Sequence, residues 1–144
     1  MALGVGQADY GVSSAALMGT SAAYIHGAVS RRLAVAVLAI PKQRPPMPTA
    51  DARIVFVKRD VTKLDVERTE TELGTGWATT IEQTALDLAT RPTLGGIDEP
   101  NAYEAIRALM LRADWPLLED LATTQHRPRA LATIVALTGR KSDA

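Results

Sequence analysis

Two short apolar segments constrain the fold of this chain more than any other feature. Residues 33–41 read LAVAVLAIP and residues 53–57 read RIVFV, so apolar side chains fall on both alternating sides of each segment. A strand that is apolar on both faces lies inside a sheet and is covered from both sides. The four prolines between residues 41 and 48 predict a loop that joins two such central strands.

The segment that follows predicts a hairpin. Residues 64–73 alternate only weakly and are polar on both faces, which is typical of an edge strand protected by charge. The sequence Gly74-Thr75-Gly76 then predicts a turn, and residues 77–80 would return as the second strand and lead into a helix.

That helix is expected over residues 80–91. Thr80 and Gln83 have the spacing of a capping box, and Glu82 lies in the first turn, where the helix dipole favours an acid. Asp87 and Arg91 are four residues apart and are expected to pair on the helix surface. Pro92 is expected to end the helix. The apolar stripe of this helix consists of Ile81, Ala85 and Leu88.

The same stretch could instead be interpreted as a catalytic site, because it holds two carboxylates. Glu82 and Asp87 are five residues apart, which separates them by about 140° around a helix axis. Two acids that diverge so far cannot act on one substrate from one face. The motif is therefore interpreted as structural.

The remaining segments complete an α+β domain. Residues 12–27 predict a helix rich in small residues that stops at Gly27. Asp98 and Asp114 are expected to cap two later helices, and a last helix would end at Gly139. We therefore predict a small, mostly antiparallel sheet of about four strands, packed with an N-terminal helix, a capped central helix and three C-terminal helices. We expect one domain over residues 1–144, with a flexible start (1–9) and a short tail (140–144).

The composition excludes several kinds of site. There is no cysteine, and the two histidines, His26 and His126, lie far apart, so neither a thiolate metal site nor a patterned zinc site is expected. The sequence lacks a phosphate-binding loop of the Walker type, a dinucleotide fingerprint and a serine-hydrolase elbow. We therefore predict no catalytic residue, no metal and no cofactor.

The apolar runs and the charges bear on partners and location. The longest apolar run is shorter than the roughly 20 residues of a membrane helix, and the N-terminus lacks the pattern of a signal peptide, so we expect a cytoplasmic protein. Net charge is zero but segregated: +4 up to Asp60, −7 from Val61 to Gln125, and +3 in the tail. Such segregation can steer a charged partner. Overall neutrality and the lack of a basic recognition helix argue against DNA as that partner.

Several of these segments occur in a recognisable order. Tyr10, the small-residue helix ending in His26-Gly27, the strand–loop–strand unit and a Thr-x-Glu-x-Thr-x-x-Asp-Leu helix follow one another. This order resembles the C-terminal domain of AbiEi-type antitoxins over roughly residues 10–96. The residues that carry the resemblance, with Gln83 among them as the capping partner, are expected to be mainly structural: Ser21, Ala22, Ala23, His26, Gly27, Thr80, Glu82, Gln83, Thr84, Asp87 and Leu88.

The resemblance implies an antitoxin of bacterial toxin–antitoxin and abortive-infection systems (type IV), which act in phage defence. The implied partner is a nucleotidyltransferase-fold toxin of the AbiEii type. Members of this family usually carry an N-terminal winged helix that binds the operon promoter, and the residues before Tyr10 are too few to form one. We therefore expect a domain of a longer protein or a short family member, and promoter binding is not carried over.

Three mechanisms remain open. The first is neutralisation of the toxin by direct protein contact, without an enzyme activity. The second is an atypical kinase-like antitoxin that uses ATP and Mg²⁺ to promote phosphorylation of the toxin. The third is a transcriptional regulator module of the operon.

An acidic edge offers a candidate contact surface. Asp65, Glu67, Glu70 and Glu72 could face the basic groove of a toxin that modifies RNA and accelerate association. Equally, these acids could serve only to discourage edge-to-edge pairing of the hairpin. On the first reading, reversing Glu70 and Glu72 to lysine weakens toxin binding in a salt-sensitive way.

Overall fold

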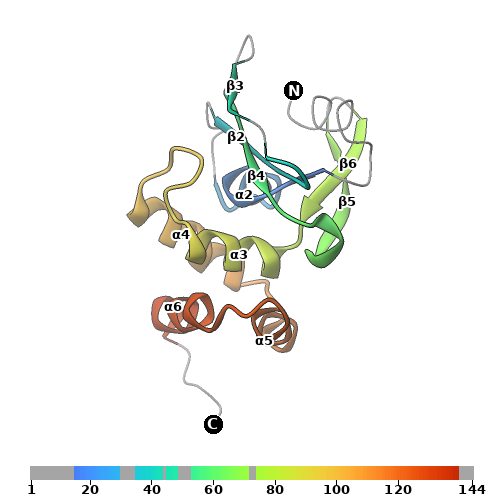
Figure 1. Ribbon diagram of the computed structural model, residues 1–144. Helices are drawn as coiled ribbons and strands as arrows, with labels where there is room; N and C mark the ends of the chain where they lie inside the picture. The colour runs from blue at the N-terminus through green and yellow to red at the C-terminus, as the bar shows by residue number, and fades with distance from the viewer. Residues whose placement is uncertain (1–14, 30–34, 44, 49–52, 72–73, 140–144) are drawn as a thin grey trace.

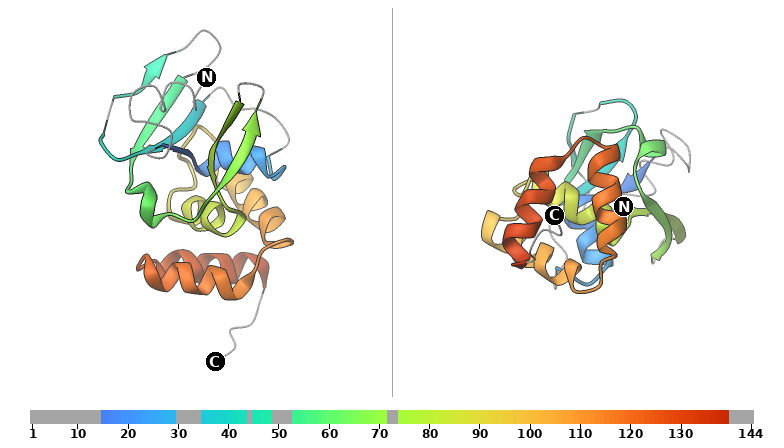
Figure 2. Two further views of the ribbon diagram at one scale, coloured as in Figure 1. Left: turned by 90° about the vertical axis from the view of Figure 1, so that its right-hand side faces the viewer. Right: turned by 90° about the horizontal axis from the view of Figure 1, so that it is seen from below.

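A sheet and a helical layer make up the fold (Figure 1). The computed structural model describes residues 15–29, 35–43, 45–48, 53–71 and 74–139. The strands lie together at one end of the molecule, helix α3 crosses the middle, and α5 and α6 lie at the opposite end (Figure 2). The α+β class predicted from the sequence is confirmed.

The sheet has six strands in the order β3-β4-β2-β1-β6-β5. The strands are β1 (Ala16–Leu17), β2 (Val35–Ile40), β3 (Met47–Pro48), β4 (Arg53–Lys58), β5 (Val66–Thr71) and β6 (Gly74–Thr79). Strands β2 and β4 pair in parallel, as do β1 and β6, whereas the other three pairs are antiparallel. The prediction of about four mostly antiparallel strands is therefore wrong in detail. The connection from β2 to β4 runs beyond the far edge of β4, so the chain re-enters the sheet in the same direction.

The two apolar segments form the central strands, as predicted. Leu38 and Phe56 belong to an apolar cluster on one face of the sheet, and Val37 and Val57 to a cluster on the other. Ile25 of α2 (Gly19–Ile25) packs against the first cluster. The second cluster is covered by the 3-10 helix Val61–Lys63 and by Leu94. The second half of β2 and most of the interior of β4 are thus covered on both faces.

Two short strands differ from the sequence prediction. The helix expected over residues 12–27 is confined to α2, because Ala16 and Leu17 pair with β2 and β6 in the interior of the sheet. Residues 12–14 lie outside the described residues. The proline-rich loop contains β3, whose Met47 pairs with Ile54. Strands of two residues are too short to produce a periodic signal, so only pairing in the folded chain defines them.

The hairpin forms with a shifted turn. Strand β5 lies at the edge of the sheet, as predicted, and pairs with β6 in antiparallel register from Val66↔Thr79 to Thr71↔Gly74. Gly74 and Gly76 are therefore part of β6 and do not form the predicted turn.

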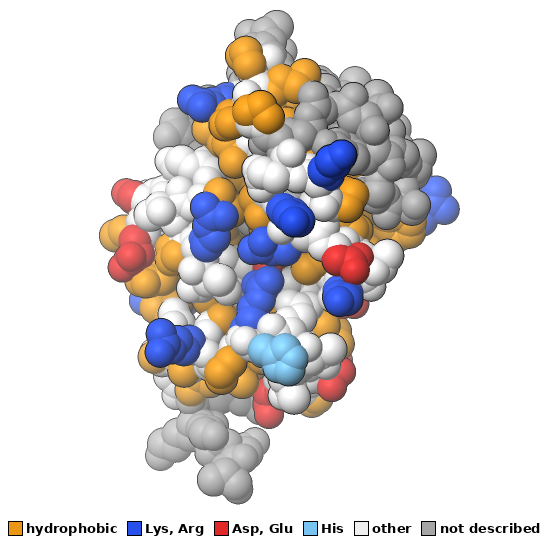
Figure 3. Space-filling model, viewed as in Figure 1, with side chains coloured by type: hydrophobic (Ala, Val, Ile, Leu, Met, Phe, Trp, Pro, Cys, Tyr) orange, Lys and Arg blue, Asp and Glu red, His pale blue; other side chains and the backbone are white. Residues whose placement is uncertain are grey.

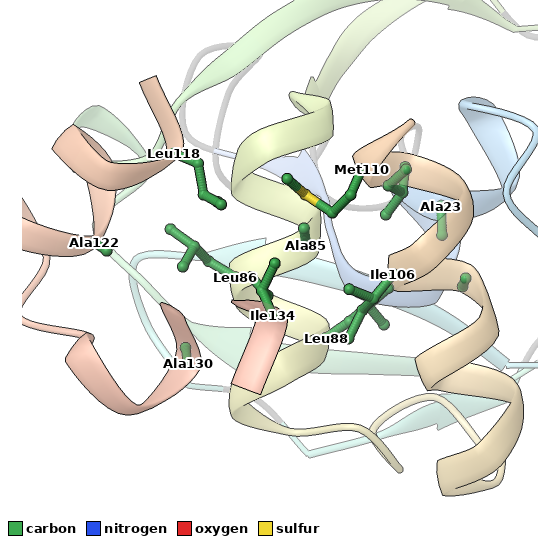
Figure 4. Packing of buried hydrophobic residues seen from close by; sticks show 12 residues of the cluster. Ala23, Ala85, Leu86, Leu88, Ile106, Met110, Leu118, Ala122, Ala130 and Ile134 are labelled. Atoms are coloured by element: carbon green, nitrogen blue, oxygen red, sulfur yellow. The ribbon is translucent and has the colours of Figure 1, made fainter. Parts of the chain in front are cut away.

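The helical layer is built around α3 (Ile81–Thr90). The other helices are α4 (Glu99–Met110), α5 (Trp115–Thr124) and α6 (Pro128–Thr138). One apolar cluster joins α2 with all four of these helices, and Leu86 of α3 packs with Leu118 and Ile134 from the C-terminal pair (Figure 4). Asp98 and Asp114 accept capping bonds from Asn101 N and Leu117 N, and Gly139 ends α6 at φ +69°, as predicted. None of the described helices has the length and apolar character needed to cross a membrane.

Candidate functional site

The polar residues of the central motif are buried inside the molecule. Four polar side chains in the first two turns of α3 are at most 7% exposed: Glu82, Gln83, Thr84 and Asp87. A buried polar group is destabilising unless it is hydrogen-bonded. Each of these side chains has a hydrogen-bond partner outside α3.

The start of α3 is bound to the start of the hairpin. Thr80 Oγ1 accepts a bond from Gln83 N at 3.4 Å, so the first half of the predicted capping box forms. The second half does not, because Thr80 N donates to Asp65 O at 3.0 Å. Thr80 Oγ1 also donates to Asp65 Oδ2 at 2.7 Å, and Asp65 N donates to Gln83 Oε1 at 3.1 Å. The carbonyl of Asp65, just before β5, therefore accepts the bond that the Gln83 side chain would accept in a capping box.

Both ends of α5 are bound to α3 through the same motif. Asp114 N donates to Glu82 Oε2 at 2.8 Å, at the N-terminal cap of α5. At its C-terminal cap, the amide of Gln125 pairs reciprocally with that of Gln83, with N···O distances of 2.5 and 3.0 Å. These contacts fix α5 against the central helix. Thr84 Oγ1 bonds Thr79 Oγ1 at 2.8 Å and so joins α3 to β6.

Asp87 forms an interior ion pair. Arg127 Nη1 donates to Asp87 Oδ1 at 2.7 Å, and the Asp87 side chain is 2% exposed. The predicted surface pair with Arg91 is wrong, because Asp87 faces the segment between α5 and α6 and Arg91 lies exposed beyond the end of the helix. Burial raises the pKa of the Asp87 carboxyl, whereas Arg127, Gln83 and Arg59 act to lower it.

Two arginines, Arg127 and Arg59, act on this carboxylate. Burial lowers the pKa of Arg59, and repulsion from Arg127 and Arg91 lowers it further, while Asp87 opposes the shift. Within the described ranges, Arg59 Nε and Asp87 Oδ2 are buried without a hydrogen-bond partner. Figure 3 shows Lys and Arg side chains gathered in a band down this view of the molecule. The ion pair of this group, Asp87 with Arg127, joins α3 to the segment between α5 and α6.

The residues of the small-residue segment that ends in His26-Gly27 are also structural. Ser21 Oγ accepts a bond from Val37 N at 2.8 Å, which joins α2 to β2. His26 Nε2 donates to Thr79 O at 2.8 Å and lies 3.7 Å from Glu67 Oε1. Gly27 follows the helix at φ +77°, a conformation that glycine adopts readily.

The acidic edge is not one continuous patch. Asp65 is half-buried and bonded to Thr80, so its carboxylate belongs to the helix cap. Glu67 and Glu70 are exposed on β5 but lie an odd number of residues apart, so they face opposite sides of the sheet. Arg68, between them, lies over the ring of Trp77 at 5.8 Å. Glu72 lies outside the described residues.

The part of the chain that the structure describes contains no cluster of three or more His, Cys, Asp or Glu side chains that could hold a metal ion.

A groove at the helical end of the molecule was not anticipated from the sequence. It has a volume of about 350 Å³ and is formed by the end of α4, the start of α5 and the end of α6. The lining residues are Arg107, Met110, Leu111, Trp115, Leu137 and Thr138. No local pattern could reveal it, because its walls come from three separate helices.

A comparison with protein families supports the resemblance that the order of the sequence motifs indicates. The family model of the AbiEi antitoxin C-terminal domain matches residues 14–114. This chain belongs to the AbiEi antitoxin family. The AbiEi match includes both motifs and ends at the N-terminal cap of α5, so α5 and α6 lie beyond it. A search of curated proteins found no match. Membership in the AbiEi family supports an antitoxin role in a toxin–antitoxin system and implies a toxin as partner.

Proposed function

We propose that this AbiEi domain neutralises a cognate toxin by direct protein contact. The proposal is supported by the hydrogen bonds and the ion pair that the family-motif residues form. Ser21, His26 and the polar residues of α3 are all engaged in bonds between elements of the fold. Residues with this role stabilise a scaffold, and a scaffold of this kind acts on its partner through its surface.

The finer identity of the partner follows from the family resemblance. We infer a nucleotidyltransferase-fold toxin of the AbiEii type, acting in the cytoplasm as part of phage defence. Such a toxin needs basic groups to hold nucleic-acid phosphates. Glu70, exposed on edge strand β5, is suited to approach those groups.

The complex itself is the first test. The chain is mixed with the purified product of the neighbouring toxin gene, and complex formation is followed by size-exclusion chromatography with and without ATP and Mg²⁺. We expect a stable complex in both conditions. New mass on the toxin that depends on ATP, with no lasting complex, would favour the kinase-like alternative and contradict neutralisation by contact.

A charge reversal tests the acidic edge. In Glu70→Lys, we expect association with the toxin to slow by about 2- to 10-fold at low salt, because complementary charge mainly accelerates encounter. The difference should shrink at high salt, where exposed charges are screened. Asp120→Lys is the matched control, since it makes the same change of charge at an exposed position of α5. Equal association rates for both variants would exclude Glu70 from steering.

A further inference from the structure

Strand β5 leaves one edge of the sheet open. It is last in the strand order, and among the described strands it pairs only with β6 (Figure 1). The pairing runs residue by residue over all six positions, so β5 has no bulge, and its sequence VERTET has no proline. The strand at the other edge, β3, is two residues long and contains Pro48. Short length, bulges and proline usually protect an edge strand, and β5 has none of them.

The backbone of β5 presents alternate residues to this open edge. Thr80 N donates to Asp65 O at 3.0 Å, and this pair continues the register of β5 with β6. Hydrogen-bonded and non-hydrogen-bonded pairs alternate along an antiparallel ladder. Every second residue after Asp65 therefore directs its N–H and C=O toward β6. The residues between them, which include Arg68 and Glu70, direct these groups away from the sheet.

The same two residues carry opposite charges. Arg68 and Glu70 are two positions apart, so their side chains lie on one face of the sheet, and both are exposed. Arg68 lies over the ring of Trp77 at 5.8 Å, which orders its side chain. Neither Arg68 nor Glu70 forms a salt bridge with another residue in the described ranges. Both charges are thus available to a strand that pairs with β5.

We propose that β5 pairs with β5 of a second copy of this chain, antiparallel and about a two-fold axis at Thr69. Arg68 then lies opposite Glu70 of the second copy, and the symmetry produces this pair twice. Both pairs use the backbone groups that point away from the sheet, so each exchanges N–H···O bonds across the interface. Opposite charges at directly paired positions stabilise such a contact further.

The charges select this register over its neighbours. A shift by two residues in one direction places Arg68 opposite Arg68 of the second copy, and a shift in the other direction places Glu70 opposite its Glu70. Like charges at directly paired positions are destabilising. A shift by one residue does not match the outward backbone groups of the two strands. A second copy supplies the complementary charges by symmetry, which favours it over an unrelated strand.

The dimer is expected to be weak and to depend on concentration. Pairing of one edge strand buries less than the roughly 800 Å² per partner of a standard interface. It also uses Glu70, which the proposed toxin contact requires on a single chain. Dimer and toxin should therefore compete for β5.

Sedimentation equilibrium of this chain alone, from about 10 μM to about 1 mM, tests the pairing. We expect a reversible dimer in this range. Glu70→Arg places like charges opposite each other at both pairs and should weaken the dimer about 10-fold. The double variant Arg68→Glu, Glu70→Arg exchanges the two charges and should restore it. Asp120→Arg, exposed on α5, is the matched control, and thermal unfolding verifies the fold of each variant.

Thr69→Cys tests the register independently. In the proposed register Thr69 lies opposite its own copy in a non-hydrogen-bonded pair, where Cα atoms are about 4.5 Å apart. A disulfide accepts Cα distances of about 4.4–6.8 Å. The chain has no cysteine, so any disulfide in this variant joins two copies. With oxidised glutathione, Thr69→Cys should form a linked dimer faster than Asp120→Cys, the exposed control.

Several results would overturn the inference. A chain that stays monomeric at about 1 mM would show that the charges of β5 only discourage pairing. A dimer that Glu70→Arg leaves unchanged would lie on another surface. A folded double variant that remains monomeric would exclude the Arg68–Glu70 pairs, and equal linking of Thr69→Cys and Asp120→Cys would exclude the register. None of these measurements contains the toxin, so they leave the proposed function standing.

Discussion

Replacing Arg127 with methionine removes the partner of a buried carboxylate while keeping most of the volume of the side chain. Asp87 would retain only the bond from Gln83 Nε2 at 3.2 Å and the more distant charge of Arg59. Removing one member of a buried ion pair typically costs 3–5 kcal/mol of unfolding free energy. Arg127 is 15% exposed and Asp87 keeps other partners, so we expect about 3 kcal/mol.

Urea denaturation measures this cost. With a slope of about 1.5 kcal/mol per molar urea for a chain of this size, the midpoint should fall by about 2 M. Far-UV circular dichroism and tryptophan fluorescence follow the same transition, because Trp77 lies in the sheet and Trp115 in α5. The matched control is Arg129→Met, an exposed position on α6, which should change stability by no more than about 0.5 kcal/mol.

The effect should also depend on pH. Burial already raises the pKa of Asp87, and loss of Arg127 removes the largest opposing influence, so the variant carboxyl binds its proton more tightly in the folded state. A raised pKa in the folded state favours folding at low pH, and this contribution is lost as pH rises through the folded pKa. Arg127→Met should therefore destabilise the protein less at pH 4 than at pH 7. A cost equal to that of Arg129→Met at both pH values would refute the assignment of Asp87–Arg127 as a buried pair.

Two further predictions concern the interior. Gln83→Leu should cost about 1–3 kcal/mol, because it leaves Asp65 N and the amide of Gln125 without their partner; in a double-mutant cycle with Gln125→Leu the two effects should not add, and simple additivity would show that the amides do not interact. Gly95→Ala should be about 1–3 kcal/mol more destabilising than Gly96→Ala in chemical denaturation, since both glycines have positive φ but only at Gly95 would a Cβ lie 2.3 Å from Thr20 Oγ1; equal costs would contradict the close approach.

Features of the fold that depend on neighbours in sequence could be predicted. Asp98 and Asp114 accept bonds from backbone N–H groups three residues further on, and Gly139 adopts the left-handed conformation that ends a helix, so their roles as caps follow from local sequence. The central strands were predictable for a similar reason, because apolar side chains on both faces require cover on both faces. Parallel pairing of β2 with β4 was not, since it depends on where the connecting loop passes.

The partners of Asp87 and Gln83 could not be deduced locally. Arg91 offered Asp87 a favourable partner one turn away, but the helix lies between the sheet and the C-terminal helices, so the distant Arg127 takes that position. The small number of charges within α3 was the available signal, because a helix that is not polar on one face is buried on several sides. The groove had no such signal, because its walls come from three separate helices.

The central claim is that neutralisation is a matter of contact, and a titration tests it most directly. A fixed concentration of toxin, well above the dissociation constant, is titrated with this chain in the absence of ATP, and toxin activity is measured at each ratio. Neutralisation by contact predicts a linear loss of activity that ends at a fixed molar ratio, and activity that returns when the complex is separated. Full inhibition at a small fraction of that ratio, which requires ATP and persists after this chain has been removed, would contradict it.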